Sequence, residues 1–155
     1  MVSDECIEAW RSLLLAQDAV LRAIETDLRR AKVIQLGWYD VLLELNAAPH
    51  RRLRMADLAA RTVLSRTRVS RLVDELAAEG FITREPDPDD GRAAFAVLST
   101  AGKATLRKAA PVYLAGIQRH FTDHLDHDER AALTHSLNKV VDAHAKPPDS
   151  RHPMR

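Results

Sequence analysis

The chain of 155 residues lacks the features that mark several classes of protein. Its one cysteine, Cys6, cannot form a disulfide within the chain, which excludes a disulfide-stapled secreted scaffold. The apolar runs are far shorter than the roughly 20 residues of a transmembrane helix, and we expect neither a membrane span nor a signal peptide. There is no glycine-rich phosphate loop, Ser/His/Asp constellation or paired metal motif. The sequence therefore predicts a cytoplasmic protein that is not an enzyme and carries no cofactor.

Glycine is scarce, with 5 residues against 24 alanines and 20 leucines. Alanine and leucine lose little side-chain freedom in a helix, whereas glycine loses much backbone freedom there. Apolar residues make up 46% of the chain, and a folded chain of this length buries roughly 68–70% of its unfolded surface. We expect one mainly α-helical domain with a core of its own.

Charge of neither sign dominates, because 23 Lys and Arg residues face 22 Asp and Glu residues. The formal net charge of +1 hides an uneven distribution. Residues 51–71 contain seven arginines and a single acid, Asp57. A basic block in an otherwise balanced chain indicates a nucleic-acid partner.

A long helix is predicted near the N-terminus. Ser3 is a suitable N-cap, and Asp4 and Glu5 follow in the first turn, where negative charge complements the helix dipole. Apolar residues then recur at three- and four-residue steps, which is a heptad pattern. They are Ile7, Trp10, Leu14, Leu21, Ile24 and Leu28. A helix over residues 4–31 would be roughly 40 Å long, so we expect its ends to pack on a second subunit; packing on its own domain is the alternative.

The middle of the chain predicts two shorter helices. The first covers Leu36–Leu45 and is stopped by Pro49, which has no backbone donor. A brief extended piece over Arg52–Met55 precedes a helix over Ala56–Arg61. The tight connection Thr62-Val63-Leu64 then leads to another helix, so that the pair forms a candidate helix-turn-helix.

The second helix of this pair is the most strongly patterned segment of the sequence. Ser65 is a good N-cap, and Gly80 stands where a left-handed C-terminal cap belongs. Between them Val69, Leu72, Val73 and Leu76 recur at helical spacing. After Gly80 the pattern changes to a period of two, and we predict strands over Phe81–Glu85 and Ala94–Leu98 around a long polar tip, 86–92.

Two further helices are predicted towards the C-terminus. Ser99 caps the first, which runs to about Phe121 with a bend near Pro111. Asp126 and Glu129 have capping-box spacing and open the second. Its apolar positions are Leu133, Leu137, Val140 and Val141. Lys146-Pro147-Pro148 ends this helix, and we expect a disordered tail to Arg155.

The order and spacing of these elements resemble the MarR family of bacterial transcription regulators over nearly the whole chain. The residues that carry the resemblance are Trp38-Tyr39-Asp40-Val41-Leu42-Leu43, Leu58-Ala59, Ser65 to Gly80, Asp90-Gly91-Arg92 and Leu98-Ser99-Thr100-Ala101-Gly102. The resemblance implies a mainly α winged helix-turn-helix with a small β-hairpin wing. It also implies an obligate homodimer that usually represses genes until a small effector or oxidant weakens its grip on DNA.

This resemblance divides the single domain into functional parts. Residues 1–35 would form an N-terminal dimerisation helix, and residues 36–98 the DNA-binding lobe. Residues 99–146 would form C-terminal dimerisation helices, followed by the tail, 147–155. Two lobes predict a pseudo-palindromic operator whose half-sites lie about 10–10.5 bp apart.

The helix after Ser65 is the candidate DNA-reading element. An α-helix fits the major groove of B-DNA, and arginine is suited to bidentate contact with guanine. We expect Arg66, Arg68 and Arg71 to contact bases or phosphates. Further contacts are expected from Ser65, Thr67 and Ser70 and, on the flanking backbone, from Arg61. A plainly solvated helix face is the alternative.

The hairpin tip supplies a second candidate contact. Arg92 can enter the narrow, electronegative minor groove, and the resemblance implies that Asp90 braces it. Asp87 and Asp89 lie in the same tip, where their charge opposes phosphate. A plain solvated turn is the alternative.

A small aromatic or phenolic effector is implied by the resemblance. Trp10, Trp38 and Tyr39 could line its pocket between the dimer helices and the lobe, and Arg52 or Arg54 could pair with its carboxylate. Contact with DNA is an equal alternative for either arginine. Core packing is the alternative role for these aromatic residues.

The spacing of two histidines is compatible with a metal site, although the sequence does not favour one. His120 and His124 have the spacing that can place two imidazoles on one helix face. Further ligands would have to come from residues such as Glu25, Asp27 or Cys6, and solvated histidines are the preferred interpretation. Cys6 itself is out of register with the sensing thiol of peroxide-responsive relatives and lacks flanking cations.

The alternative functions are a zinc-responsive regulator of the same fold and a winged-helix protein-interaction module without DNA binding.

Overall fold

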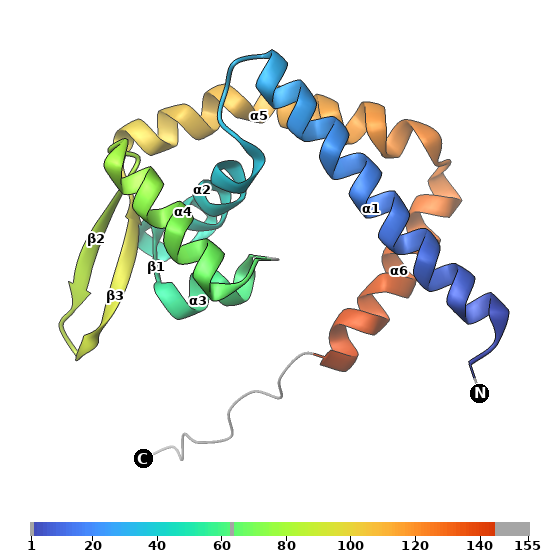
Figure 1. Ribbon diagram of the computed structural model, residues 1–155, viewed down its shortest axis with the longest axis horizontal. Helices are drawn as coiled ribbons and strands as arrows, with labels where there is room; N and C mark the ends of the chain where they lie inside the picture. The colour runs from blue at the N-terminus through green and yellow to red at the C-terminus, as the bar shows by residue number, and fades with distance from the viewer. Residues whose placement is uncertain (1, 63, 145–155) are drawn as a thin grey trace.

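The computed structural model describes residues 2–62 and 64–144, which form a mainly helical chain with one small sheet (Figure 1). The α-helices are α1 (Asp4–Arg30), α2 (Leu36–Ala47), α3 (Met55–Arg61), α4 (Arg66–Ala78), α5 (Thr100–His120) and α6 (His127–His144). The strands are β1 (Arg52–Arg54), β2 (Ile82–Asp87) and β3 (Asp90–Leu98), and the 3-10 turns are η1 (Pro49–Arg51) and η2 (Thr122–His124). The predicted fold class is confirmed. The predicted tail, 147–155, lies outside the described residues.

The chain has two regions that α5 connects (Figure 1). A lobe on one side contains α2, α3, α4 and the sheet, while α1 and α6 extend on the other side. The helix α5 contacts both α1 and α2, and it continues through Pro111 as a single helix. Within the described part of the chain, no helix combines the length and hydropathy needed to cross a membrane.

The predicted cap residues stabilise the helix ends. The side chains of Ser3, Ser65 and Ser99 each accept a hydrogen bond from a backbone N–H in the first turn that follows. Asp126 and Glu129 cap each other reciprocally, with both N–H to carboxylate distances 2.8 Å. These local predictions are confirmed because each depends on residues only three positions apart.

The core lies mainly in the lobe. It contains Val41, Leu42 and Leu45 of α2, and Val69, Leu72, Val73 and Leu76 of α4, together with Ile24 and Leu28 at the end of α1. The junction between the lobe and α5 is so close that a Cβ atom at Gly102 would overlap the carbonyl oxygen of Phe81. This packing fixes α4 and the sheet on the inner end of α5.

The sheet has the order β1-β3-β2, with both pairs antiparallel. The long polar tip predicted over 86–92 is wrong, because β2 continues to Asp87 and β3 begins at Asp90. Only Pro88 and Asp89 remain between the strands. The polar residues stay in the strands because Asp87 is held from both sides: Arg54 of β1 pairs with it at 2.7 Å, and the Asp89 N–H donates to it at 2.9 Å.

Candidate nucleic-acid interface and adjoining cavity

The helix α4 has one buried face and one cationic face. Ser65 accepts a hydrogen bond from the Arg68 N–H at 3.3 Å and so sets the start of the helix. The apolar residues Val69, Leu72, Val73 and Leu76 are buried. The opposite side carries exposed Arg66, Thr67, Arg68 and Arg71, with Ser70 half-buried beside them.

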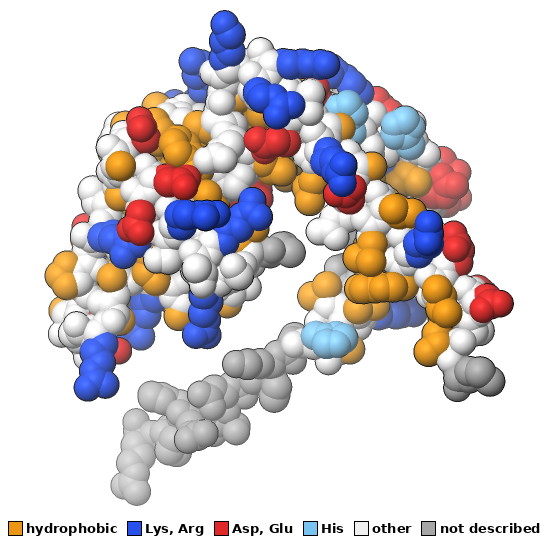
Figure 2. All heavy atoms as spheres, viewed as in Figure 1, with side chains coloured by type: hydrophobic (Ala, Val, Ile, Leu, Met, Phe, Trp, Pro, Cys, Tyr) orange, Lys and Arg blue, Asp and Glu red, His pale blue; other side chains and the backbone are white. Residues whose placement is uncertain are grey.

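The predicted DNA-contacting arginines are not held by acids. Among the described residues, none of Arg61, Arg66, Arg68, Arg71 and Arg92 makes an ion pair. The acid Asp74 in the later turns of α4 is paired at 2.7 Å with Arg84 of β2. Figure 2 shows Lys and Arg side chains over the lobe and its wing. The positive charge of this surface is therefore available to an external anion.

The wing, which is the hairpin of β2 and β3, differs in detail from the predicted one. The carboxylate of Asp90 accepts a hydrogen bond at 3.0 Å from the backbone N–H of Arg92 and shapes the strand there, while both side chains are exposed. The side chain of Asp87 is only 1% exposed and is paired with Arg54. The expectation that its charge faces phosphate is therefore wrong, because β1 brings a guanidinium to it from outside the hairpin.

In the part of the chain that the structure describes, the four residues predicted to line an effector pocket lie in different surroundings. Trp10 lies on a groove between α1 and α6, and Arg54 is occupied by Asp87. Tyr39 is buried and stacks on Tyr113, with ring centroids 4.2 Å apart. Of the four, Trp38 lines the cavity beside the lobe. Trp38 and Tyr39 are adjacent in sequence and point to different sides of α2, and the assignment of these four residues to an effector pocket stays a prediction.

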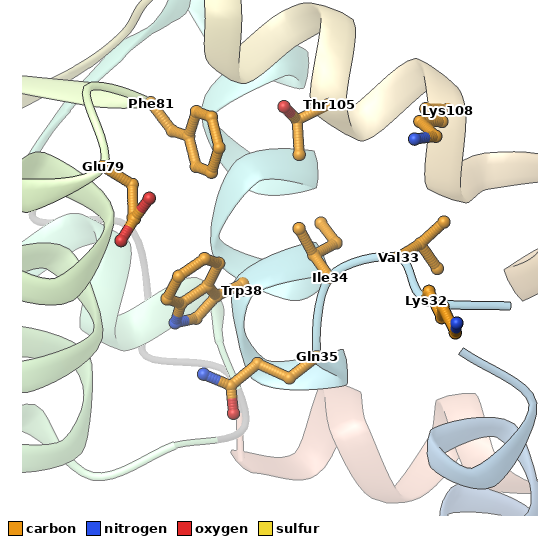
Figure 3. Close-up of a pocket in the computed structure, with 9 residues that line it drawn as sticks. All are labelled: Lys32, Val33, Ile34, Gln35, Trp38, Glu79, Phe81, Thr105 and Lys108. Carbon is orange, nitrogen blue, oxygen red and sulfur yellow. The ribbon is translucent and has the colours of Figure 1, made fainter. Parts of the chain in front are cut away.

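The cavity beside the lobe has a volume of about 490 Å³ (Figure 3). It lies between the α1–α2 connection, the end of α4 and the first half of α5, and its lining residues are Lys32, Val33, Ile34, Gln35, Trp38, Glu79, Phe81, Thr105 and Lys108. Trp38 and Phe81 meet edge to face at 6.1 Å. Lys32 and Lys108 lie at the opposite end from Trp38 (Figure 3). The two lysines and Phe81 were not predicted from the sequence, because no periodic pattern connects residues from such separate elements.

The cavity wall is joined to α4 by hydrogen bonds. The indole Nε1 of Trp38 donates to Oε2 of Glu75 at 2.9 Å, and the side-chain amide of Gln35 donates to the same oxygen at 3.4 Å. Glu75 belongs to the later part of α4, nearly two turns after Arg68. The cavity and the cationic face are thus parts of one connected structure.

Comparison with known proteins assigns the chain to a family. Residues 34–93 match the family model described as "MarR family". The structure of AbsC, a MarR family transcriptional regulator from Streptomyces coelicolor, is 30% identical and superposes with a TM-score of 0.81 over 92% of this chain and 96% of that chain. The chain belongs to the MarR family.

Two other relatives extend the comparison. Sco3205 from Streptomyces coelicolor, solved in complex with DNA, is 27% identical, with a TM-score of 0.82 over 99% of this chain and 96% of that chain. YkoM of Bacillus subtilis, an HTH-type transcriptional regulator, is 33% identical over 87 residues, which are 56% of each chain. The chain thus spans about half the length of this curated relative. All three relatives are described as transcriptional regulators.

One member of the predicted histidine pair, His120, has a structural partner in this MarR chain. His120 contacts the Asp27 carboxylate at 2.8 Å, and Arg119 lies 3.3 Å from the same oxygen. The hydrogen bond from His120 is the main cause that lowers the pKa of Asp27. His124 lies on η2, exposed, and no group of three or more His, Cys, Asp or Glu residues suited to a metal ion occurs within 2–62 and 64–144. Asp27 therefore joins α1 to α5 through these two side chains.

Proposed function

We propose that this chain is a dimeric, sequence-specific DNA-binding regulator that represses transcription until a small ligand releases it from DNA. The observation that carries the proposal is the cationic face of α4, whose arginines have no acidic partner among the described residues. Such a face on a capped helix matches the shape and charge of the major groove.

In this function the N-terminal half of α4 lies in the major groove. Arg66, Arg68 and Arg71 contact base edges or phosphates, and Ser65, Thr67 and Ser70 donate to phosphates or read base edges. Arg61 binds the flanking backbone. Arg92 on the wing enters the adjacent minor groove, and Asp90 shapes the strand that carries it.

A second copy of the chain is proposed to cover the outer part of α1 and α6. Of the heptad residues in α1, Ile24 and Leu28 are buried, whereas Ile7 and Trp10 are 53% and 61% exposed. A groove of about 790 Å³ runs between α1 and α6, and its lining is almost wholly apolar (Figure 2). No residue of α6 is buried within the chain. An apolar face of this extent is typical of an obligate dimer interface.

The proposed ligand site is the cavity at Trp38 and Phe81. Its volume of about 490 Å³ is in the range of small-molecule sites. Aromatic side chains form one end, and the ammonium groups of Lys32 and Lys108 lie at the other (Figure 3). A small aromatic anion could pack its ring against Trp38 and Phe81 and pair its negative charge with Lys32 and Lys108.

Selection of duplexes from a random DNA library, followed by binding measurements across a salt series, tests the function. We expect a pseudo-palindromic duplex with half-sites about 10–10.5 bp apart, and log K that falls by about 0.9 per phosphate neutralised as log salt rises. Failure to retain any duplex at low salt would overturn the proposal and would favour a winged-helix protein-interaction module instead.

A further inference from the structure

Glu75 of α4 makes hydrogen bonds to residues of the cavity wall, and the same helix carries the cationic face. It lies in the later part of α4, half-buried, and one carboxylate oxygen accepts from both Trp38 and Gln35. Gln35 is the N-cap residue of α2, and Trp38 lies in its first turn. The two donors are therefore wall residues of the cavity and also the start of a neighbouring helix.

The other polar contacts of α4 side chains point in a different direction. Asp74 pairs with Arg84 of β2, and Arg84 also donates to the backbone oxygen of Ser70 at 3.4 Å. These contacts tie α4 to the wing. Among the described residues, the side-chain hydrogen bonds that join α4 to the cavity wall are those of Glu75.

We propose that Glu75 is a positioning residue that couples the occupancy of the cavity to the orientation of the recognition helix α4. This inference rests on the proposed DNA-binding function of α4. A ligand that takes up the Trp38 indole N–H or displaces its ring leaves the half-buried carboxylate with the longer hydrogen bond from Gln35 but without the shorter one from Trp38, which is unfavourable. The position of α4 relative to α2 then changes. The distances between the arginines of α4 and the major groove of the DNA change with it.

Because coupling between two sites is reciprocal, DNA bound to α4 must alter the surroundings of Trp38. This consequence can be measured without knowing the ligand. The chain contains two tryptophans, Trp10 and Trp38. A ¹⁵N-labelled protein therefore gives two indole N–H signals, and Trp38→Phe identifies the one that contacts Glu75.

The first experiment measures this indole signal in the absence of DNA. In Glu75→Ala we expect the Trp38 signal to move upfield, because the hydrogen bond to the carboxylate is lost. Glu75→Gln is the matched variant, since it removes the charge but keeps a side-chain oxygen that can accept, and its signal should remain near that of the unaltered protein. An unchanged Trp38 signal in Glu75→Ala would overturn the inference.

The second experiment measures discrimination between a duplex selected by the unaltered protein and a scrambled duplex. We expect Glu75→Ala to lower this ratio by about fivefold or more, Trp38→Phe to lower it similarly, and the double variant to lower it no further. Glu75→Gln should keep most of the discrimination between the selected and the scrambled duplex. The selected duplex should also shift the Trp38 indole signal of the unaltered protein.

The outcomes separate this inference from the function on which it rests. If the unaltered protein selects a duplex and Glu75→Ala discriminates equally well, DNA binding stands and the coupling through Glu75 is wrong. If the two single variants have additive effects, Glu75 and Trp38 act separately and the inference is again wrong. If the unaltered protein selects no duplex, the proposed function and this inference fall together.

Discussion

Arg54 and Asp87 form an ion pair of 2.7 Å that joins β1 to the turn of the wing. The Asp87 side chain is 1% exposed, whereas that of Arg54 is 47% exposed. The pair does not have hydrogen-bond geometry, and Oδ2 of Asp87 has no hydrogen-bond partner among the described residues. The other oxygen accepts from the Asp89 N–H. The wing is thus anchored by one buried carboxylate held between two segments far apart in sequence.

Asp87→Ala should destabilise the wing. It leaves the Asp89 N–H and the Arg54 guanidinium without their partner, and because Arg54 is half solvated we expect a loss of about 1–3 kcal/mol in the free energy of unfolding. Urea denaturation measures this loss. Asp89→Ala, at the exposed neighbouring position, is the control and should stay within about 0.5 kcal/mol. Equal stability of the two variants would show that the ion pair does not anchor the wing.

Arg71→Ala should weaken DNA binding without unfolding the protein. Arg71 is exposed on α4 and makes no ion pair among the described residues, so its removal exposes no buried partner. If it reads a guanine, we expect a loss of roughly 1–3 kcal/mol on the selected duplex and relaxed preference at one base pair. Arg107→Ala on the exposed side of α5 is the control. Affinity equal to the control for every duplex would remove Arg71 from the interface.

Trp10→Asp should weaken the proposed dimer. Trp10 is 61% exposed in the single chain and lines the apolar groove between α1 and α6. Burial of a charge where an aromatic ring packs should cost about 2 kcal/mol or more in association. Sedimentation across a concentration series measures the shift towards monomer. Leu43→Asp, at a 38% exposed leucine of α2 outside this groove, is the control, and an identical monomer fraction would contradict the proposed interface.

Asp40 should give the fold a specific pH dependence. Burial raises its pKa to about 6 from 3.8, and the nearby Glu44 and Glu25 carboxylates add to the shift. The folded chain therefore holds this proton through a pH range in which the unfolded chain has lost it. The contribution of Asp40 to the free energy of unfolding is fully present below about pH 4 and is lost as the pH rises through about 6.

Asp40→Asn should remove this pH dependence. Because Asp40 is partly solvated, we expect the variant to gain only about 1–2 kcal/mol of unfolding free energy at pH 7 and little below pH 4. Urea denaturation at pH 4, 5, 6 and 7 measures the difference between the two proteins. A gain that is constant across this range would contradict a titrating Asp40.

Several elements were predictable because their causes are local. The caps at Ser65 and Ser99 depend on an N–H three residues away, and the apolar spacing of Val69 to Leu76 determines which face of α4 is buried. The order of such elements also carried the resemblance to the MarR family. The DNA-contacting roles of Arg66, Arg68, Arg71 and Arg92 stay predictions, although the structure places these side chains in solvent.

The sequence by itself determined the helices, the cap residues, the position of the helix-turn-helix and the cationic side of α4, since each follows from neighbours within one or two turns. Only the tertiary structure decided the length of the wing strands, the lining of the cavity and the partners of Asp27, Asp87 and Glu75. Those depend on contacts such as Trp38 with Glu75, which lie 37 positions apart. No periodic pattern encodes a contact of that kind, because it arises only when separately formed elements pack together.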